Sequence, residues 1–309
     1  MRHIIPISGK DSLTTAIIQT ARENHDYEYF FNPTGLELPE VFTWLDMIEK
    51  ELDITIVRVG KPLKDIIKKY NYFLPSQQKR YCTRESKIEP MLEWIGKAPA
   101  TVYYGIRADE NRVGFNNSTS PNITPVYPLD IMGIDLRGVY LILNKYNLKP
   151  PTFFWEEIYQ SVKAKLGYDP KPILPEYIFD MLFSWRSRPN CDRCYNQRYY
   201  EWVGLLEHHP DRFWEAESWE HKGGEETYTW SSNQKSLQEI ADESENHKAK
   251  RVKAIIKSIK KYEHTICLTM KTVIKPLMCW PPQAADYFVV NKKSLNYSFR
   301  LFDTVKLRH

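Results

Sequence analysis

The sequence predicts an α/β fold, in which a doubly wound, mostly parallel sheet precedes a helical lobe that carries cysteines and a C-terminal extension. Two observations lead to this prediction. Strand and helix patterns alternate over the first half of the chain, which is typical of parallel sheets covered by helices. After this half, a Cys-x-x-Cys pair is followed by a segment rich in aromatic residues, which indicates a second, helical part of the chain. We place the three parts at residues 1–150, 151–232 and 233–309.

The first half contains strand and helix patterns in regular alternation, which predicts a Rossmann-like sheet. The predicted strands are residues 3–7, 27–31, 54–59 and 101–106. The predicted helices are residues 12–22, 40–52, 64–70 and 86–95, with a further helix-like stretch that ends at Tyr146.

Composition excludes several classes of protein. Of 309 residues, 42% are hydrophobic and 14% aromatic, which excludes a disordered chain. We find neither an apolar run long enough for a membrane span nor a signal-peptide pattern, so we expect a cytoplasmic protein without membrane partners. Five cysteines are an odd, sparse set for a disulfide scaffold and are better explained as thiols, ligands or nucleophiles. The net charge of +4 allows a polyanionic partner without requiring one.

The first predicted strand runs into a polar cluster and then into a helix. Backbone N–H groups in such a turn, at the positive end of a helix dipole, form a site for a phosphate anion. Lys10 adds a mobile charge, and Asp11 and Ser12 are suited to cap the helix or to reach a metal ion. An ordinary capped turn is equally compatible with these residues alone. The cluster consists of Ser8, Gly9, Lys10, Asp11 and Ser12.

Three more polar clusters, residues 32–37, 75–82 and 107–112, follow later in the predicted sheet. Ligands of parallel sheets bind beyond the carboxyl ends of the strands. We therefore expect the four clusters to face one crevice.

Five segments, in order over about residues 4–200, match motifs of one family. Residues 8–12 are similar to Ser-Gly-Gly-Lys-Asp-Ser, and 32–40 to Asp-Thr-Gly-x-Glu-x-Pro-Glu. Residues 82–90 are similar to Cys-Thr or Cys-Cys before Lys-hydrophobic-x-Pro, 105–112 to Gly-x-Arg-x-x-Glu with a nearby Arg, and 188–194 to an Arg shortly before Cys-x-x-Cys. The chain thus resembles the adenine nucleotide alpha-hydrolase (PP-loop ATP pyrophosphatase) superfamily, in its phosphoadenylyl-sulfate reductase-like branch.

The resemblance implies an adenine nucleotide site in a PP-loop domain. Lys10 and Asp11, together with Cys82, are the expected catalytic residues. Glu37 is expected near magnesium or the ribose, with the basic groups after the third and fourth motifs holding the anion from the opposite side. A solvated surface residue or a surface ion pair is the alternative for each charged residue. The expected nucleotide-binding residues are Ser8, Gly9, Lys10, Asp11, Ser12, Thr34, Gly35, Glu37, Lys87, Arg107, Glu110 and Arg112.

Three departures from the family pattern bear on activity. Ser8 stands where a second glycine is common, and a residue with a Cβ restricts positive φ. Asn32 replaces an Asp, which removes a carboxylate that a metal ion could use. The sulfonucleotide reductases carry their catalytic thiol in a Glu-Cys-Gly-x-His segment, and neither Cys267 nor Cys279 has that setting.

Cys191 and Cys194 have a spacing that lets one turn present two thiolates to one metal. The resemblance implies that Cys82 joins them as a ligand of a 4Fe-4S cluster. Zinc completed by a histidine is the alternative, as are redox-active or structural thiols. The histidines considered for zinc are His208, His209 and His264.

The resemblance implies an enzyme that adenylates its target with ATP and magnesium and then replaces AMP with sulfur, supplied by a sulfur donor protein. One alternative is a sulfonucleotide reductase that binds adenylyl sulfate. Another is a non-catalytic subunit of a larger assembly that binds nucleotide or nucleic acid.

Aromatic residues beyond the cysteine pair favour the core of a helical lobe, with base stacking beside Arg193 and Arg198 as the alternative. Residues 236–262 are expected to form one long helix. Its apolar stripe is surrounded by seven basic residues within 248–261, which indicate either a solvated face or a contact with a nucleic-acid backbone. Beyond Cys267 we expect short strand-like pieces. The aromatic residues are Tyr195, Tyr199, Tyr200, Trp202, Trp214, Trp219, Tyr228 and Trp230.

Overall fold

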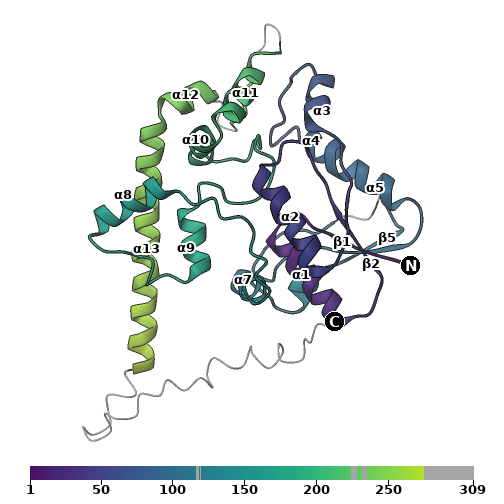
Figure 1. The fold of residues 1–309 in the computed structure, drawn as a ribbon, viewed down its shortest axis with the longest axis horizontal. Coiled ribbons are helices and arrows are strands. Elements are labelled where there is room, and N and C mark those ends of the chain that lie inside the picture. Colours follow the sequence, from purple (N-terminus) through teal and green to yellow (C-terminus); the bar gives the residue numbers. More distant parts are fainter. Residues whose placement is uncertain (116–117, 119, 224–227, 232–234, 275–309) are drawn as a thin grey trace, which may run out of the picture.

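The computed structural model describes residues 1–115, 118, 120–223, 228–231 and 235–274. Its first half is built on a five-stranded, all-parallel sheet in the order β3-β2-β1-β4-β5, which confirms the predicted α/β class (Figure 1). The strands are β1 (Arg2–Pro6), β2 (Tyr27–Phe31), β3 (Ile56–Arg58), β4 (Ala100–Tyr103) and β5 (Ile123–Val126).

Helices cover both faces of the sheet because successive residues of a buried strand point to opposite sides. Ile5 packs with Leu13 and Trp44 in one apolar cluster, whereas Ile4 packs with Met91 and Ile95 in the other. The helices of this half are α1 (Lys10–Arg22), α2 (Pro39–Leu52), α3 (Leu63–Lys69), α4 (Tyr81–Thr83), the π-helical segment η1 (Arg84–Ile88), α5 (Glu89–Ile95), α6 (Pro128–Ile131) and α7 (Leu136–Lys145).

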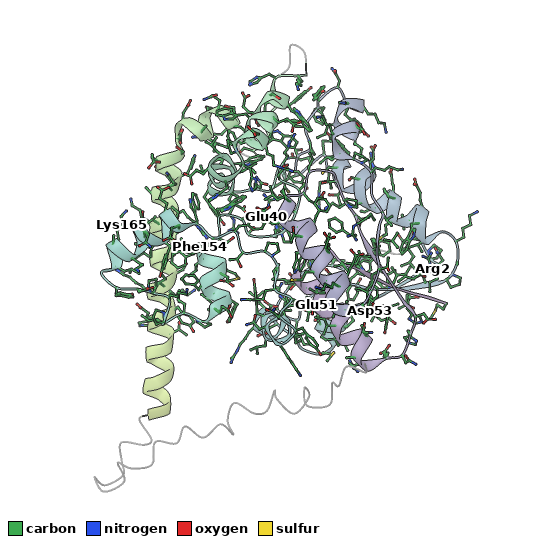
Figure 2. All side chains as sticks on the ribbon, viewed as in Figure 1. Arg2, Glu40, Glu51, Asp53, Phe154 and Lys165 are labelled. Atoms are coloured by element: carbon green, nitrogen blue, oxygen red, sulfur yellow. The ribbon has the colours of Figure 1, made fainter. Side chains whose placement is uncertain are left out.

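The strand order places β1 between β2 and β4, so the chain direction across the sheet reverses at β1. Such a switch point opens a crevice beyond the carboxyl ends of the strands. The loops after β1, β2 and β4 all leave the sheet at this edge. Figure 2 shows Glu40, at the start of α2, on the side of the helical lobe, with Asp53 at the other end of the helix.

The helical lobe buries the tryptophans that the sequence predicts as core. Trp202, Trp219 and Trp230 are almost fully buried, and they belong to the same apolar cluster as Ile5. Trp214 is exposed. Arg193 is itself buried and not open to base stacking, whereas Arg198 is exposed, so base stacking stays an alternative only beside Arg198. The helices are α8 (Glu156–Leu166), α9 (Glu176–Phe183), α10 (Tyr199–His208), α11 (Pro210–Glu220), α12 (Leu237–Asp242) and α13 (Ser244–Ile274).

Two expectations were wrong. Residues 236–262 form two helices rather than one, and α13 continues to Ile274, where strand-like pieces were expected. Asp242 and Glu243 are unfavourable at the negative end of α12, while Glu245 is favourable in the first turn of α13, so the charges favour a break here. Strand β5 was missed because it has four residues and contains Pro125, which a sheet accepts at its edge.

No helix in the described ranges is both long and apolar enough to cross a membrane. The predicted boundary at 232/233 and Cys279 lie outside the described residues, and the boundary near 150 falls between α7 and α8.

Candidate functional site

The loop after β1 is closed by the hydroxyl of Ser12. This oxygen accepts hydrogen bonds from the backbone N–H groups of Ser8 (2.8 Å) and Gly9 (3.1 Å) and donates one to the carbonyl of Gly9 (2.9 Å). Ser8 is not among the residues with positive φ, and Gly9 has an extended backbone with φ of 174°. The single-glycine loop therefore forms without backbone strain. Lys10 pairs with Asp11 at 2.9 Å in the first turn of α1.

The loop after β4 packs directly on the start of α1. A Cβ atom on Gly105 would lie 2.5 Å from the backbone nitrogen of Ser12 and 2.8 Å from the carbonyl oxygen of Asp11, so only glycine fits. Arg107 then reaches back to Asp11 at 3.1 Å. The two loops thus form one wall of the crevice.

Arg107 is held by carboxylates on three sides. It pairs with Asp11, with Asp109 at 2.8 Å and with Glu110 at 3.1 Å, and only 11% of its side chain is exposed. Burial alone would lower its pKa, but the hydrogen bond to Asp109 and the charge of Asp11 raise the pKa overall. Arg112 is exposed and pairs with Glu110 at 3.0 Å. In this structure Arg107 orients Asp11, and an incoming anion would compete with three carboxylates for it.

Glu37 faces into its own turn instead of the crevice. Its carboxylate accepts hydrogen bonds from the N–H groups of Thr34 (2.9 Å) and Gly35 (3.0 Å) and from the hydroxyl of Thr34 (2.6 Å), and its side chain is 2% exposed. Gly35 has a φ of +75°, which glycine adopts without strain. These hydrogen bonds conflict with the expected contact of Glu37 with magnesium or ribose. Glu37 instead stabilises the 34–37 turn.

The hydrogen bonds of Asn32 show why an amide, and not a carboxylate, stands at this position. Its amide nitrogen donates to the carbonyl of Val59 and to that of Lys87 (3.3 Å), which a carboxylate cannot do. It thereby ties the end of β2 to η1. The π-helical turn of η1 carries Lys87, and such turns are frequent at functional sites.

The three predicted ligand cysteines lie in one neighbourhood. The thiol of Cys191 hydrogen-bonds to Cys194, which lowers the pKa of Cys194 to about 6 and raises that of Cys191. Burial raises the pKa of Cys82, whose charge interacts with that of Cys194. Lys87 acts electrostatically on both Cys82 and Cys191. Cys194 thus carries the most acidic thiol of the three.

The segment before the cysteine pair lies next to the phosphate loop. A Cβ atom placed on Gly9 would lie 4.0 Å from the ring of Pro189. Arg188 directly precedes Pro189. Its positive charge favours the thiolate of Cys194 and so helps to lower the pKa of Cys194. This contact places the cysteine loop against the predicted phosphate site.

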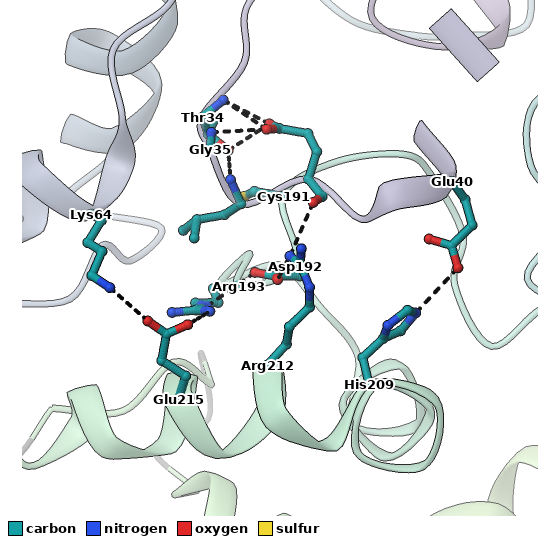
Figure 3. Close-up of polar contacts among 12 residues, drawn as sticks. Thr34, Gly35, Glu40, Lys64, Cys191, Asp192, Arg193, His209, Arg212 and Glu215 are labelled. Atoms are coloured by element: carbon teal, nitrogen blue, oxygen red, sulfur yellow. Dashed lines mark hydrogen bonds and ion pairs between the residues drawn. The ribbon is translucent and has the colours of Figure 1, made fainter. Parts of the chain in front are cut away.

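The two residues between the cysteines are buried and charged, and they clamp this loop to the sheet domain (Figure 3). The N–H of Asp192 donates to the carbonyl of Leu36 (2.7 Å), and its carboxylate accepts from Arg212 (2.6 Å). Arg212 also donates to the carbonyl of Glu37 (3.1 Å). The cysteine loop and the 34–37 turn are therefore joined by one direct hydrogen bond and by Arg212, which donates to both segments.

Arg193 extends the clamp to a third segment. Its guanidinium lies 4.4 Å from the ring centroid of Trp219 and binds Glu215 at 2.5 Å. Glu215 also pairs with Lys64, in α3, at 3.0 Å. The Asp-Arg pair inside the Cys-x-x-Cys motif was a visible signal for this role, which the sequence analysis missed.

Thiols are suitable donors for an iron–sulfur cluster or for zinc. Within the described residues, however, no group of three or more His, Cys, Asp or Glu side chains is already arranged to hold a metal ion. Ligation by all three cysteines requires their side chains to turn toward a common point. Zinc completed by histidine gains no support, since His208 stacks on Trp185, His209 pairs with Glu40 at 3.4 Å, and His264 is exposed.

Contacts connect all five motif segments into one site. The loop after β4 (105–112) contacts the phosphate loop (8–12). The cysteine segment (188–194) lies next to the phosphate loop and is hydrogen-bonded to the segment after β2 (32–40). The segment that contains η1 (82–90) is hydrogen-bonded to 32–40 and interacts electrostatically with the cysteine segment. The predicted convergence at the carboxyl edge is thus present for these segments.

Comparison with known proteins supports the first domain. Residues 2–119 match the family model of the phosphoadenosine phosphosulfate reductase domain. The chain is also 24% identical over 226 residues to an uncharacterised protein of Methanocaldococcus jannaschii, a match that covers 70% of this chain and 43% of that protein. The chain therefore spans less than half the length of this relative. No solved structure matches the chain.

Proposed function

We propose that the protein is an ATP-dependent enzyme that adenylates its target and transfers sulfur to it, because residues 2–119 match the family model of the phosphoadenosine phosphosulfate reductase domain. The observation that carries the proposal is the placement of the cysteine loop against the phosphate loop, through Pro189 and Gly9. An adenylated target and a sulfur-handling group would meet there.

The proposed reaction has two steps. An oxygen of the target attacks the α-phosphorus of ATP, and pyrophosphate leaves with its electron pair. A sulfur nucleophile from a donor protein then attacks the activated carbon, and AMP leaves. The contribution of the protein is positioning and neutralisation of charge.

Each residue has a defined task in this proposal. The N–H groups of Lys10, Asp11 and Ser12, in the first turn of α1, and the ammonium of Lys10 hold the phosphates, because the Ser12 hydroxyl already occupies the N–H groups of Ser8 and Gly9. Asp11 orients Lys10, to which it is paired, and is the carboxylate best placed for magnesium. Lys87 supplies positive charge beside the thiols. Glu37 and Arg107 shape the loops, as their contacts indicate.

We further propose that Cys82, Cys191 and Cys194 hold a 4Fe-4S cluster. When bound, such a cluster supplies an open iron site that holds sulfide. Three thiols suit iron better than a hard cation. Anaerobic purification tests this, because a brown protein with iron and sulfide in equal amounts is expected, whereas a colourless protein with stoichiometric zinc contradicts the cluster.

Sulfonucleotide reduction is a second candidate that one observation favours. The hydrogen bond to Cys191 lowers the pKa of Cys194, which lies beside the crevice, where a thiolate is able to attack the sulfur of adenylyl sulfate. A tight adenylyl-sulfate complex with thiol-dependent release of sulfite would establish this activity in place of adenylation.

Binding of ATP with magnesium to the full chain tests the nucleotide site. We expect Lys10→Gln to weaken ATP binding at least tenfold, while Lys50→Gln, an exposed lysine of α2, binds as the wild type does. Equal binding by the Lys10 variant would contradict the proposal. Exchange of labelled pyrophosphate into ATP, with candidate targets added, then tests the adenylation step.

A further inference from the structure

The seven basic residues of α13 between positions 248 and 261 fall into two groups. Lys248 pairs with Glu157 (2.9 Å), Glu207 (3.0 Å) and Glu245 (2.5 Å), and only 12% of its side chain is exposed. Arg251 donates to the carbonyl of Leu182 (2.6 Å) and lies 4.2 Å from the ring centroid of Tyr200. These two residues fasten α13 to the lobe and are not available to a partner.

The other five basic residues are exposed and share one face. At about 100° of rotation per residue, they fall within a sector of about 100°. The buried residues Val252, Ile255 and Ile259 lie on the opposite side of the helix and pack into the lobe. We call the five residues the lysine stripe, which consists of Lys250, Lys253, Lys257, Lys260 and Lys261.

Neighbouring carboxylates do not neutralise the lysine stripe. Glu245 is bound to Lys248, Glu243 is hydrogen-bonded by Lys235, and Glu263 accepts a hydrogen bond from the hydroxyl of Tyr168 (2.6 Å). Within the part of the chain that the structure describes, the ion pairs of α13 involve only Lys248 and His247. The lysine stripe therefore presents a line of positive charge to the solvent.

We propose that the lysine stripe binds the phosphate backbone of a nucleic acid. The stripe extends over about 17 Å of helix, since each residue rises about 1.5 Å. On each strand of a nucleic-acid duplex the phosphates repeat about every 3.4 Å of the duplex axis, so a stripe of this length that runs along the axis spans about five of them. Lysines on an exposed helix face hold the backbone and do not read bases, so the contact is independent of sequence.

A lipid surface fits this face less well than a nucleic acid. Helices that lie on membranes insert an apolar face between the lipids. The apolar residues of α13 between positions 252 and 259 are instead used to pack against the lobe. The exposed face carries charge without an apolar anchor.

The nucleic acid would be the acceptor of the proposed sulfur transfer, and this last step rests on the proposed function. Binding itself does not, because it needs neither ATP nor turnover. In Figure 1 the lobe helices α9 and α10 lie between α13 and the sheet, so the lysine stripe serves to hold a long polymer and not to contact the reacting atoms.

Binding of labelled oligonucleotides to the full chain tests the proposal, with a variant that combines Lys250→Gln, Lys253→Gln and Lys257→Gln. The control combines Lys50→Gln, Lys68→Gln and Lys97→Gln, which removes the same charge from exposed positions elsewhere. Fluorescence anisotropy is measured over a range of salt concentrations with single-stranded RNA, single-stranded DNA and duplex DNA, and vesicles with anionic lipid serve as the competing partner.

We expect the stripe variant to bind at least tenfold more weakly, and its slope of log affinity against log salt to be less steep by about 2 to 3, while the control stays within twofold of the wild type. The oligonucleotide that binds best identifies RNA or DNA as the partner. Equal losses in both variants, no binding at low salt, or binding to vesicles alone would overturn the proposal. The Lys10→Gln variant distinguishes this proposal from the proposed function, because it should no longer bind ATP but should still bind nucleic acid.

Discussion

Single residues decide whether the loops of the crevice can meet. Ser8 and Gly9 close the phosphate loop in ordinary backbone conformations, so the loss of the family's second glycine costs no strain. Asn32 uses an amide where the family has a carboxylate, and it donates to two carbonyl groups. Gly105 has no room for a side chain, because the backbone of α1 occupies the place of its Cβ atom.

Replacement of Gly105 by Ala should force the loop after β4 away from α1. We expect a loss of about 1–3 kcal/mol in the free energy of unfolding, as for other overpacked sites, and ATP binding weakened at least tenfold. Denaturant unfolding and equilibrium dialysis measure the two effects. Gly138→Ala, where a Cβ approaches only side-chain atoms at 3.0 Å or more, serves as the control and should change neither by much. Unchanged ATP binding in the Gly105 variant would show that this contact does not shape the site.

Glu220 makes the stability of the lobe depend on pH. Burial raises the pKa of Glu220 from 4.5 to about 7, although its carboxylate accepts hydrogen bonds from the N–H groups of Trp230 and Leu237 (both 2.8 Å). The folded protein thus binds this proton more tightly than the unfolded chain. The resulting stability is fully present below about pH 4.5 and is lost as the pH rises through 7.

We therefore expect the free energy of unfolding to fall by about 1–3 kcal/mol between pH 5 and 8 because of this group. Denaturant unfolding of Glu220→Gln over that range should show a flatter pH dependence than the wild type. Glu51→Gln, at an exposed carboxylate near the end of α2, should retain the wild-type dependence. Parallel curves for the Glu220 variant and the wild type would assign the pH effect to other groups.

At the scale of elements, the loop between α9 and α10 is the piece that joins the lobe to the sheet. Asp192 connects it to the 34–37 turn and to α11, and Arg193 connects it to Glu215 and through Glu215 to α3. These contacts come from segments far apart in the sequence. They place the cysteines more firmly than the short loop could by itself.

Asp192→Asn should remove one charge from this buried network and leave Arg212 without its carboxylate partner, while Arg193 keeps only its pair with Glu215. Breaking a buried ion pair costs about 3–5 kcal/mol, so we expect a loss of about 3 kcal/mol in the free energy of unfolding. Backbone hydrogen exchange should also become faster in residues 188–194. For comparison, Glu93→Gln breaks an exposed pair with Lys61 and should cost less than about 1 kcal/mol. Equal, small losses in both variants would mean that the clamp does not hold the loop.

Elements with strong periodicity could be predicted from the sequence, and those set by tertiary contacts could not. The first three strands and the helices α1 and α2 lie within a few residues of their predicted positions, because their apolar patterns are regular. Strand β5 depends on pairing with β4, which its four residues do not signal. The break between α12 and α13 lies inside a continuous helical pattern. The five site segments were predictable from motifs, whereas the inward turn of Glu37 depends on the bonds of its own loop.

At the scale of the whole molecule, one apolar core extends from β1 to α13. The proposed nucleotide crevice lies at the carboxyl edge of the sheet, and the proposed lysine stripe lies on α13, which packs against the lobe (Figure 1). Because the core connects the two sites, a nucleic acid bound to α13 would keep a fixed position relative to the crevice at the sheet edge. The stripe and the crevice should therefore be separable by mutation while they act on the same substrate.

Hydrogen–deuterium exchange of the full chain, with and without ATP and magnesium, tests the central claim most directly. The account predicts slower exchange in the peptides that cover residues 7–13, 32–38, 104–112 and 188–194, with no change in 250–261, and it predicts that Lys10→Gln abolishes this protection. Protection that is absent with both ATP and adenylyl sulfate, or that falls on other segments, would contradict a nucleotide crevice at the carboxyl edge of the sheet.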